Sequence, residues 1–88
     1  MILIIQKTPR FNRTYRKLSE QQKRDFKKAV RLFLLDPFDR KIKTHKLRGQ
    51  LKNFWSFSIN FSDRVLFQFL GERAVMLYDI GDHDIYCG

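Results

Sequence analysis

A strictly alternating stretch between Phe54 and Phe61 sets the narrowest limit on the fold of this 88-residue chain. Apolar side chains occupy every second position, and small polar side chains fill the positions between them. Because successive side chains of a strand point to opposite faces of a sheet, this pattern predicts a half-buried strand. Its inward face would carry Trp55, Phe57, Ile59 and Phe61, and its outward face Ser56, Ser58 and Asn60.

The first forty residues carry the signals of two consecutive helices. Thr8-Pro9 predicts a helix start, with an N-cap residue followed by proline at the first helical position. Ser19 with Gln22 predicts a capping box for a second helix, which ends before Pro37 because the residue before a proline avoids the α region. The apolar side of this second helix is formed by Phe26, Ala29, Val30, Phe33 and Leu34.

Further strands are predicted over residues 2–6, 64–70 and 74–80, with a two-residue turn at Gly71-Glu72. The element order is therefore β-α-α-β-β-β. It predicts an α+β fold in which an antiparallel sheet packs one face on an αα-hairpin. The length fits a single domain over residues 1–88.

Arg64 should lie on the outward face of the sheet, because an unpaired guanidinium in the core costs several kcal/mol. An odd-length loop or a bulge after Phe61 gives this placement. The same register places Asp79 opposite Arg64. It leaves an outward apolar strip, which suggests a protein partner and consists of Leu66, Val75 and Leu77.

The charge is unevenly distributed along the chain. The net charge is +9, but residues 1–52 hold 16 basic and four acidic side chains, whereas residues 53–88 hold two basic and five acidic ones. A basic half of this kind favours a polyanionic partner, nucleic acid before membrane. We expect a reduced, cytoplasmic compartment and no metal or nucleotide cofactor. This view rests on the single cysteine and on three missing patterns: a zinc-ligand spacing, a Gly-rich phosphate loop and a long apolar run.

Four short signatures occur in order along the chain. They are His45-Lys46-Leu47-Arg48-Gly49, Phe54-Trp55-Ser56, Arg64-Val65-Leu66-Phe67 and Gly81-Asp82-His83-Asp84-Ile85-Tyr86. With these signatures and the element order, nearly the whole chain resembles the RelE/ParE superfamily of bacterial toxins from type II toxin–antitoxin modules. It is most similar to the RelE/YoeB-like branch of mRNA interferases.

The resemblance implies a metal-independent endoribonuclease that cleaves mRNA on the ribosome by attack of a 2′-hydroxyl on the adjacent phosphate. Its partners would be a cognate antitoxin, mRNA and rRNA. Arg64 is similar to the phosphate-binding arginine of the family, His83 to its C-terminal acid or base, and Tyr86 to the aromatic residue that orients a base or phosphate. His45 is the favoured general base, with Lys41, Lys43 and Lys46 as alternatives.

Seven cations are assigned to RNA or ribosome binding, and three of them are the lysines already named as alternative bases. They lie in the basic stretch after the second helix and on the exposed side of that helix, at Lys41, Lys43, Lys46, Arg48, Lys23, Lys27 and Arg31.

The chain departs from the pattern of the family at three places. Ser56 and Ser58 stand where some ribonuclease members carry lysines, and Lys41 stands where YoeB-like members have a glutamate. Asp79 stands where other members have an arginine. Two alternatives therefore remain: a ParE-like toxin that binds DNA gyrase without cutting RNA, and a non-catalytic basic RNA-binding domain.

Overall fold

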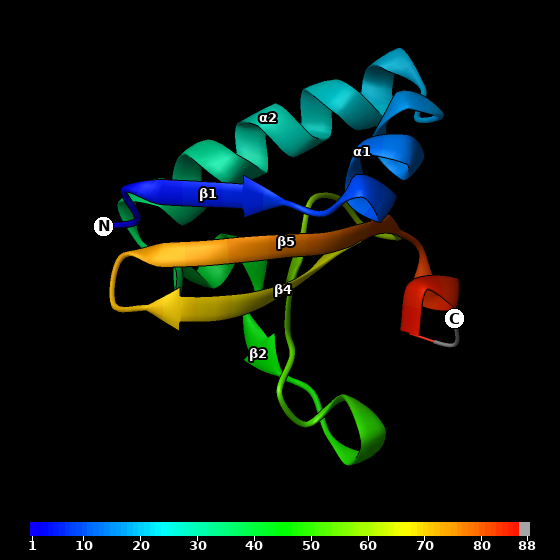
Figure 1. Cartoon of the computed structure of the whole chain (residues 1–88). Helices are drawn as coiled ribbons and strands as arrows, with labels where there is room; N and C mark the ends of the chain where they lie inside the picture. The colour runs from blue at the N-terminus through cyan, green and yellow to red at the C-terminus, as the bar shows by residue number, and fades with distance from the viewer. Residues whose placement is uncertain (87–88) are drawn as a thin grey trace.

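Two helices cover one face of a five-stranded sheet in this computed structural model (Figure 1). The structure describes residues 1–86 of the chain, without the side chains of His83 and Asp84. The helices are α1 (Pro9–Arg16) and α2 (Glu20–Leu35), and the strands are β1 (Ile4–Lys7), β2 (His45–Lys46), β3 (Trp55–Ser58), β4 (Arg64–Gly71) and β5 (Ala74–Gly81). Three 3₁₀ turns complete the fold: η1 (Arg40–Ile42), η2 (Gly49–Leu51) and η3 (His83–Tyr86).

Both predicted helix starts are confirmed. The Thr8 side chain accepts a hydrogen bond from the Phe11 amide, with Pro9 at the first helical position. At α2, Ser19 and Gln22 form the complete capping box. The helix ends at Leu35, before Asp36-Pro37, as the proline requires.

The sheet has the strand order β1-β5-β4-β3-β2. The predicted α+β fold and element order are confirmed, and β2 is a short additional strand within the basic stretch after α2. Strands β2 to β5 pair antiparallel as predicted, but β1 pairs parallel with β5, so the sheet is mixed and not wholly antiparallel. A parallel pair needs a long connection between its two strands. Here α1, α2 and three strands lie between β1 and β5 along the sequence.

The core lies between the helices and the inner face of the sheet. Phe33 of α2 stacks on Phe57 of β3, with ring centroids 4.5 Å apart, and meets Phe67 edge-on at 5.0 Å. All three rings are fully buried. Each buried aromatic side chain contributes on the order of 2–3 kcal/mol to stability, so this aromatic cluster joins α2 to the middle of the sheet.

The predicted register of β5 is wrong, because a bulge separates Leu77 from Asp79. Leu66 pairs with Asp79, but its neighbour Phe67 pairs with Leu77, so Tyr78 is an extra residue. One extra residue reverses the alternation of every position before it. Val75 and Leu77 therefore point into the core instead of outward. Met76 and Tyr78, which strict alternation would place inside, are only half-buried.

The outward apolar strip predicted from Leu66, Val75 and Leu77 consequently does not exist. Val75 and Leu77 are fully buried in the core. Leu66 does face outward, but it is only 7% exposed, because the chain after β5 folds back over it. Phe61 is a further correction. It was predicted to point inward, yet it lies in the loop after β3 and is 98% exposed.

Candidate functional site

The outer face of the sheet brings four strands into one row. His45 of β2 pairs with Ser56 of β3, Ser56 pairs with Leu66 of β4, and Leu66 pairs with Asp79 of β5. Directly paired residues place their side chains on the same face, with Cβ atoms about 5 Å apart. The row therefore runs across the sheet from His45 at one end to Asp79 at the other.

A second row lies two residues further along the strands. Ser58 pairs with Arg64, and Arg64 pairs with Gly81. This confirms that Arg64 is on the outer face with Ser56 and Ser58. It corrects the expected partner, because Asp79 sits opposite Leu66 and not opposite Arg64.

The chain turns back at Gly81, and η3 covers the middle of the first row. A Cβ atom added to Gly81 would lie only 2.9 Å from the Ile85 side chain, so this close return requires glycine. Ile85 and Tyr86 line a cleft together with Leu66 and Asp79. The C-terminal turn is therefore part of the outer face and not a loose tail.

Tyr86 is tied to the row by its hydroxyl group. Its Oη atom lies 2.6 Å from Ser56 Oγ, and Ser56 is fully buried. Ser56 is also the residue that pairs with His45 across β2 and β3, so Tyr86 contacts the position of the row next to His45. His83 belongs to η3, but its side chain lies outside the described residues.

His45 has a defined ring orientation. Its Nδ1 atom lies 3.0 Å from the Lys43 carbonyl oxygen, which can only accept, so Nδ1 carries the proton in this contact. In the neutral imidazole, Nε2 then has the free lone pair. The exposed His45 ring is thus oriented so that Nε2 can accept a proton.

Arg64 directs its guanidinium at the loop that precedes it. Its Nη1 atom contacts the carbonyl oxygens of Asn60, Phe61 and Asp63 at 3.4, 3.3 and 3.2 Å. These distances exceed those of strong hydrogen bonds, and three acceptors share one nitrogen. The contacts orient the side chain at little energetic cost, which leaves it suited to charge-assisted binding of an anion.

Side-chain hydrogen bonds hold this loop against α2. Asn60 Oδ1 accepts from the Ser62 and Asp63 amides, while its Nδ2 donates to Asp25 at 2.9 Å and to Asp63 at 2.8 Å. The hydrogen bond from Asn60, followed by one from Gln21, lowers the pKa of Asp25 below its ordinary value of 3.8. The loop that carries the exposed Phe61 is thus anchored at its base.

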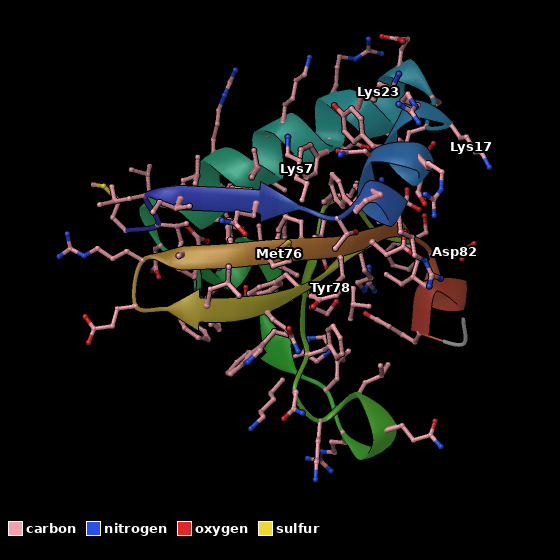
Figure 2. All side chains as sticks on the ribbon, viewed as in Figure 1. Lys7, Lys17, Lys23, Met76, Tyr78 and Asp82 are labelled. Atoms are coloured by element: carbon pink, nitrogen blue, oxygen red, sulfur yellow. The ribbon has the colours of Figure 1, made fainter. Side chains whose placement is uncertain are left out.

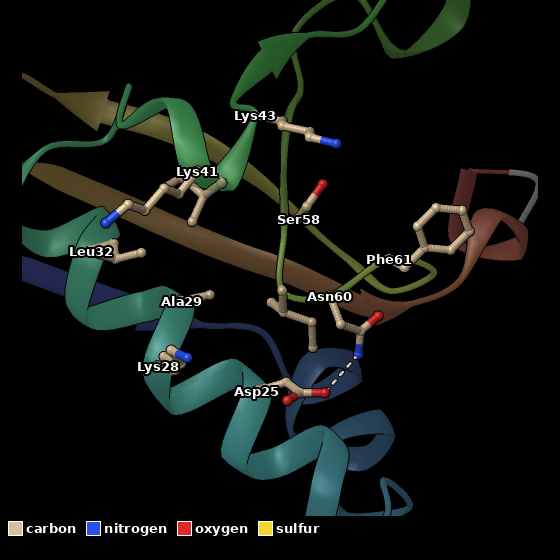
Figure 3. Close-up of a pocket in the computed structure, with 11 residues that line it drawn as sticks. Asp25, Lys28, Ala29, Leu32, Lys41, Lys43, Ser58, Asn60 and Phe61 are labelled. Atoms are coloured by element: carbon tan, nitrogen blue, oxygen red, sulfur yellow. Dashed lines mark hydrogen bonds between the residues drawn. The ribbon is translucent and has the colours of Figure 1, made fainter.

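Lys41 and Lys43 line a separate groove of about 500 Å³ between α2, η1 and β3 (Figure 3). Its walls include Ala29, Leu32 and Ile59, and Lys28 lies on the helix side. Lys43 has a left-handed backbone, with φ 54°, at the end of η1. The lining of this groove is therefore mixed, since Asp25, Ser58 and Asn60 join the apolar side chains and the lysines, and Phe61 itself lies in its wall.

The remaining predicted cations do not join the outer-face rows. Lys46 pairs with Trp55, so it lies on the opposite face of β2 from His45, and Arg48 precedes η2. Figure 2 shows Lys23 in the helical layer, and its ammonium group lies 5.7 Å from the Tyr15 ring centroid. Lys27 and Arg31 are exposed on the same helix. These cations therefore lie across the sheet from Tyr86 or at its margin.

Two partners on the outer face were missed by sequence reasoning. Ser56 was placed correctly, but its bond to Tyr86 was not foreseen. Arg10 of α1 was not considered at all, although its Nε atom forms an ion pair with Asp79 Oδ2 at 2.9 Å. The available signal was the Thr8-Pro9 helix start, which fixes Arg10 in the first turn of α1.

The arrangement combines a histidine, a tyrosine hydroxyl and two arginines on one face. Such groups suit the binding and transfer chemistry of a phosphodiester. Among the residues that the structure describes, histidine, cysteine, aspartate and glutamate form no group of three that could hold a metal ion. In that same part of the chain, no helix is long and apolar enough to cross a membrane.

No protein-family model matches the chain, and no curated protein matches it significantly. Solved structures do. The structure of YafQ from E. coli strain BL21(DE3) aligns with a TM-score of 0.77 and 14% identity, covering 96% of this chain and 97% of YafQ. A YoeB/ParE toxin from Agrobacterium tumefaciens aligns with a TM-score of 0.78 and 16% identity, covering 92% of this chain and 99% of that toxin. A chain of the Staphylococcus aureus YoeB-YefM toxin-antitoxin complex aligns with a TM-score of 0.74 and 15% identity, covering 94% of this chain and 99% of that one.

These likenesses extend over nearly the full length of both chains in each case. At 14–16% identity they establish the fold and not the activity. The chain therefore has the fold of the RelE/ParE superfamily of toxins from toxin–antitoxin modules, as the four signatures predicted.

Proposed function

We propose that this chain is the toxin of a type II toxin–antitoxin system and acts as a metal-independent, ribosome-associated endoribonuclease on mRNA. One observation carries the proposal. On a RelE/ParE fold, Tyr86 is hydrogen-bonded to Ser56, the cross-strand neighbour of His45, on the same outer face that presents Arg64. The basic charge of the chain fits a polyanionic substrate.

The reaction is an internal transfer of the phosphodiester bond. A base removes the proton of a 2′-hydroxyl, and the 2′-oxygen forms a bond to the adjacent phosphorus. The bond from phosphorus to the 5′-oxygen breaks, and an acid protonates that oxygen. The products are a 2′,3′-cyclic phosphate and a 5′-hydroxyl end, so atoms and electrons balance without a co-reactant.

Each role has a candidate side chain. His45 is the base, since its Nδ1 contact with the Lys43 carbonyl leaves Nε2 as the acceptor. Lys41, Lys43 and Lys46 remain alternatives for this role. Arg64 balances the charge that develops on the phosphate, His83 serves as the acid, and Tyr86 orients the substrate.

Cations away from the outer face support docking on the ribosome. Lys23, Lys27 and Arg31 lie on α2, while Arg48 and Lys46 lie near β2, and all of these except the half-buried Lys23 are exposed. Exposed cations of this kind bind rRNA phosphates without reading sequence. The toxin would thus meet mRNA in the cytoplasm.

An antitoxin protein is the proposed partner. The YoeB structure from Staphylococcus aureus is a complex with YefM, described as toxin-antitoxin. An acidic segment of a cognate antitoxin would match the basic stretch over residues 40–52 of this chain.

The test is to incubate purified protein with translating ribosomes and map the new mRNA ends. The proposal expects cleavage within the coding sequence that leaves 5′-hydroxyl ends. The cleavage rate should be unchanged when the toxin is first treated with excess EDTA and then returned to the Mg²⁺ buffer that ribosomes need. Intact mRNA together with inhibition of DNA gyrase supercoiling would favour a ParE-like toxin. Intact mRNA, active gyrase and RNA binding would favour a non-catalytic domain.

A further inference from the structure

Asp79 and Arg10 form a fixed ion pair at the end of the outer-face row. Asp79 is only 4% exposed. Its Oδ2 atom contacts Arg10 Nε at 2.9 Å, and its Oδ1 atom accepts from the Ile80 amide at 2.9 Å. Each carboxylate oxygen therefore has a partner, so the carboxylate is held in place and fixes the position of the guanidinium.

The backbone of Arg10 is equally well placed. The Thr8 amide donates to the Leu77 carbonyl at 3.0 Å, and Thr8 Oγ1 donates to the Tyr78 carbonyl at 2.8 Å. These bonds attach the start of α1 to β5 directly beside Asp79. The Arg10 side chain is nevertheless 51% exposed. One edge of the guanidinium thus meets a buried anion while the group as a whole still faces solvent.

A cleft of about 210 Å³ opens beside this pair. Arg10 and Asp79 lie in its wall, and the remaining lining includes Phe54, Leu66, Tyr78 and Tyr86. The Phe54 and Tyr78 rings meet edge-on, with centroids 4.8 Å apart. Aromatic and aliphatic walls with one cation match a planar ring attached to an anion, which is the chemistry of a nucleotide.

We propose that Arg10, held in place by Asp79, binds an RNA phosphate whose neighbouring base enters this cleft. The inference rests on the proposed function and adds a contact from α1 that the sequence did not assign. A guanidinium has five N–H donors in a planar fork, so a carboxylate at one edge permits a phosphate oxygen at another. Asp79 is a positioning residue, because it acts only through Arg10.

The alternative is that the pair is structural only and joins α1 to β5. The two readings differ for a variant in which both charges are removed together, since a purely structural pair can be replaced by neutral isosteres.

The experiment compares Arg10→Gln, Asp79→Asn and the double variant with wild type, using Arg13→Gln as the matched control. Arg13 is an exposed arginine on the same helix. The probe is an RNA trinucleotide with 2′-O-methyl riboses, which cannot be cleaved by 2′-oxygen attack. Its binding is measured by NMR titration of the arginine Nε–Hε signals and by the dissociation constant.

The expected result is that the Arg10 signal shifts with the trinucleotide, whereas the Arg13 signal does not. The double variant should melt near wild type, since no buried charge is left unpaired, yet bind the trinucleotide about tenfold or more weakly. Asp79→Asn should weaken binding in the wild-type background but add nothing in the Arg10→Gln background.

Wild-type affinity in the double variant overturns the inference, and so does an unshifted Arg10 signal, whether the trinucleotide binds elsewhere or not at all. Cleavage on ribosomes is recorded in parallel. Normal mRNA cleavage by the double variant would reject the Arg10 contact while the proposed nuclease stands. A shifted Arg10 signal with no wild-type cleavage would reject the nuclease while the RNA contact stands.

Discussion

The hydroxyl oxygen of Tyr86 lies 2.6 Å from the hydroxyl oxygen of the fully buried Ser56, and this contact links the C-terminal turn to the central strands of the sheet. Ser56 belongs to β3, and Tyr86 is in η3, after β5 has ended. The position of one proposed site residue therefore depends on a small polar side chain that alternation alone would class as outward-facing.

Removing either hydroxyl should reveal this dependence. Ser56→Ala and Tyr86→Phe each delete the same hydrogen bond. Tyr86→Phe should cost more, about 1–3 kcal/mol, because it leaves the buried serine hydroxyl without this partner. Urea denaturation of both single variants and the double variant should give a coupling energy of about 1 kcal/mol. Strictly additive losses would show that the contact contributes nothing to stability.

Arg64→Ala should abolish toxicity while the domain stays folded. Loss of one charged donor to a developing phosphate oxyanion costs about 3 kcal/mol, or on the order of 100-fold in rate. The melting temperature should fall by less than about 5 °C, because Arg64 makes only long contacts to three carbonyl oxygens. Single-turnover cleavage and thermal melting measure the two effects.

Arg73→Ala is the matched control for Arg64, since Arg73 is an exposed arginine in the turn between β4 and β5. It should cleave mRNA at the wild-type rate. A much lower melting temperature for Arg64→Ala than for Arg73→Ala would make Arg64 a structural residue.

Capping signals predicted both helices correctly because they depend on residues within one turn. Thr8 binds the amide of Phe11, and Ser19 exchanges hydrogen bonds with Gln22. Neither contact requires knowledge of the rest of the chain. The same holds for the alternation of β3, whose Ser56 and Phe57 face the sides that the pattern indicated.

The register of β5 was not predictable in this way. The bulge at Tyr78 follows from how Leu77 and Ile80 fit the core against β4, and no local residue type marks it. The outer face depends on that bulge, and the Arg10–Asp79 pair joins residues from opposite ends of the sequence. Sequence reasoning therefore placed Arg64 and Ser56 correctly but missed the partners that tertiary packing brings to them.

His83→Gln should slow single-turnover cleavage on ribosomes by about 100- to 10,000-fold, because glutamine can form hydrogen bonds but cannot transfer a proton. Ribosome binding should stay close to that of wild type. Effects on catalysis and on ribosome binding are separated by measuring cleavage at saturating enzyme and binding by cosedimentation. Full cleavage by this variant would remove His83 from the mechanism, and weak cosedimentation would assign it to binding.

Association with an acidic antitoxin should be sensitive to salt. The net charge of +9 is concentrated in the first 52 residues, and the charges at Lys41 and Lys43 are exposed. Raising the salt from about 0.05 to 0.5 M shortens the Debye length from more than 10 Å to about 4 Å. The association rate constant should fall by about tenfold or more, as measured by surface plasmon resonance. An unchanged rate constant would rule out electrostatic steering.

The contact between Asp25 and the loop beneath Phe61 should lose its effect in acid. The Asn60 amide holds the pKa of Asp25 below 3.8, so folding favours the charged carboxylate. A lowered pKa in the folded state gives stability that is fully present above about pH 4 and is lost as the pH falls through that lowered value. Asp25→Asn should therefore be less stable than wild type at pH 7. Urea denaturation should show the difference shrinking steadily below about pH 4.

Glu72→Gln, at an exposed position in the turn between β4 and β5, is the control, and its stability should equal that of wild type both at pH 7 and in acid. A constant difference between Asp25→Asn and wild type across the acid range would show that the ionised carboxylate is not what holds the loop.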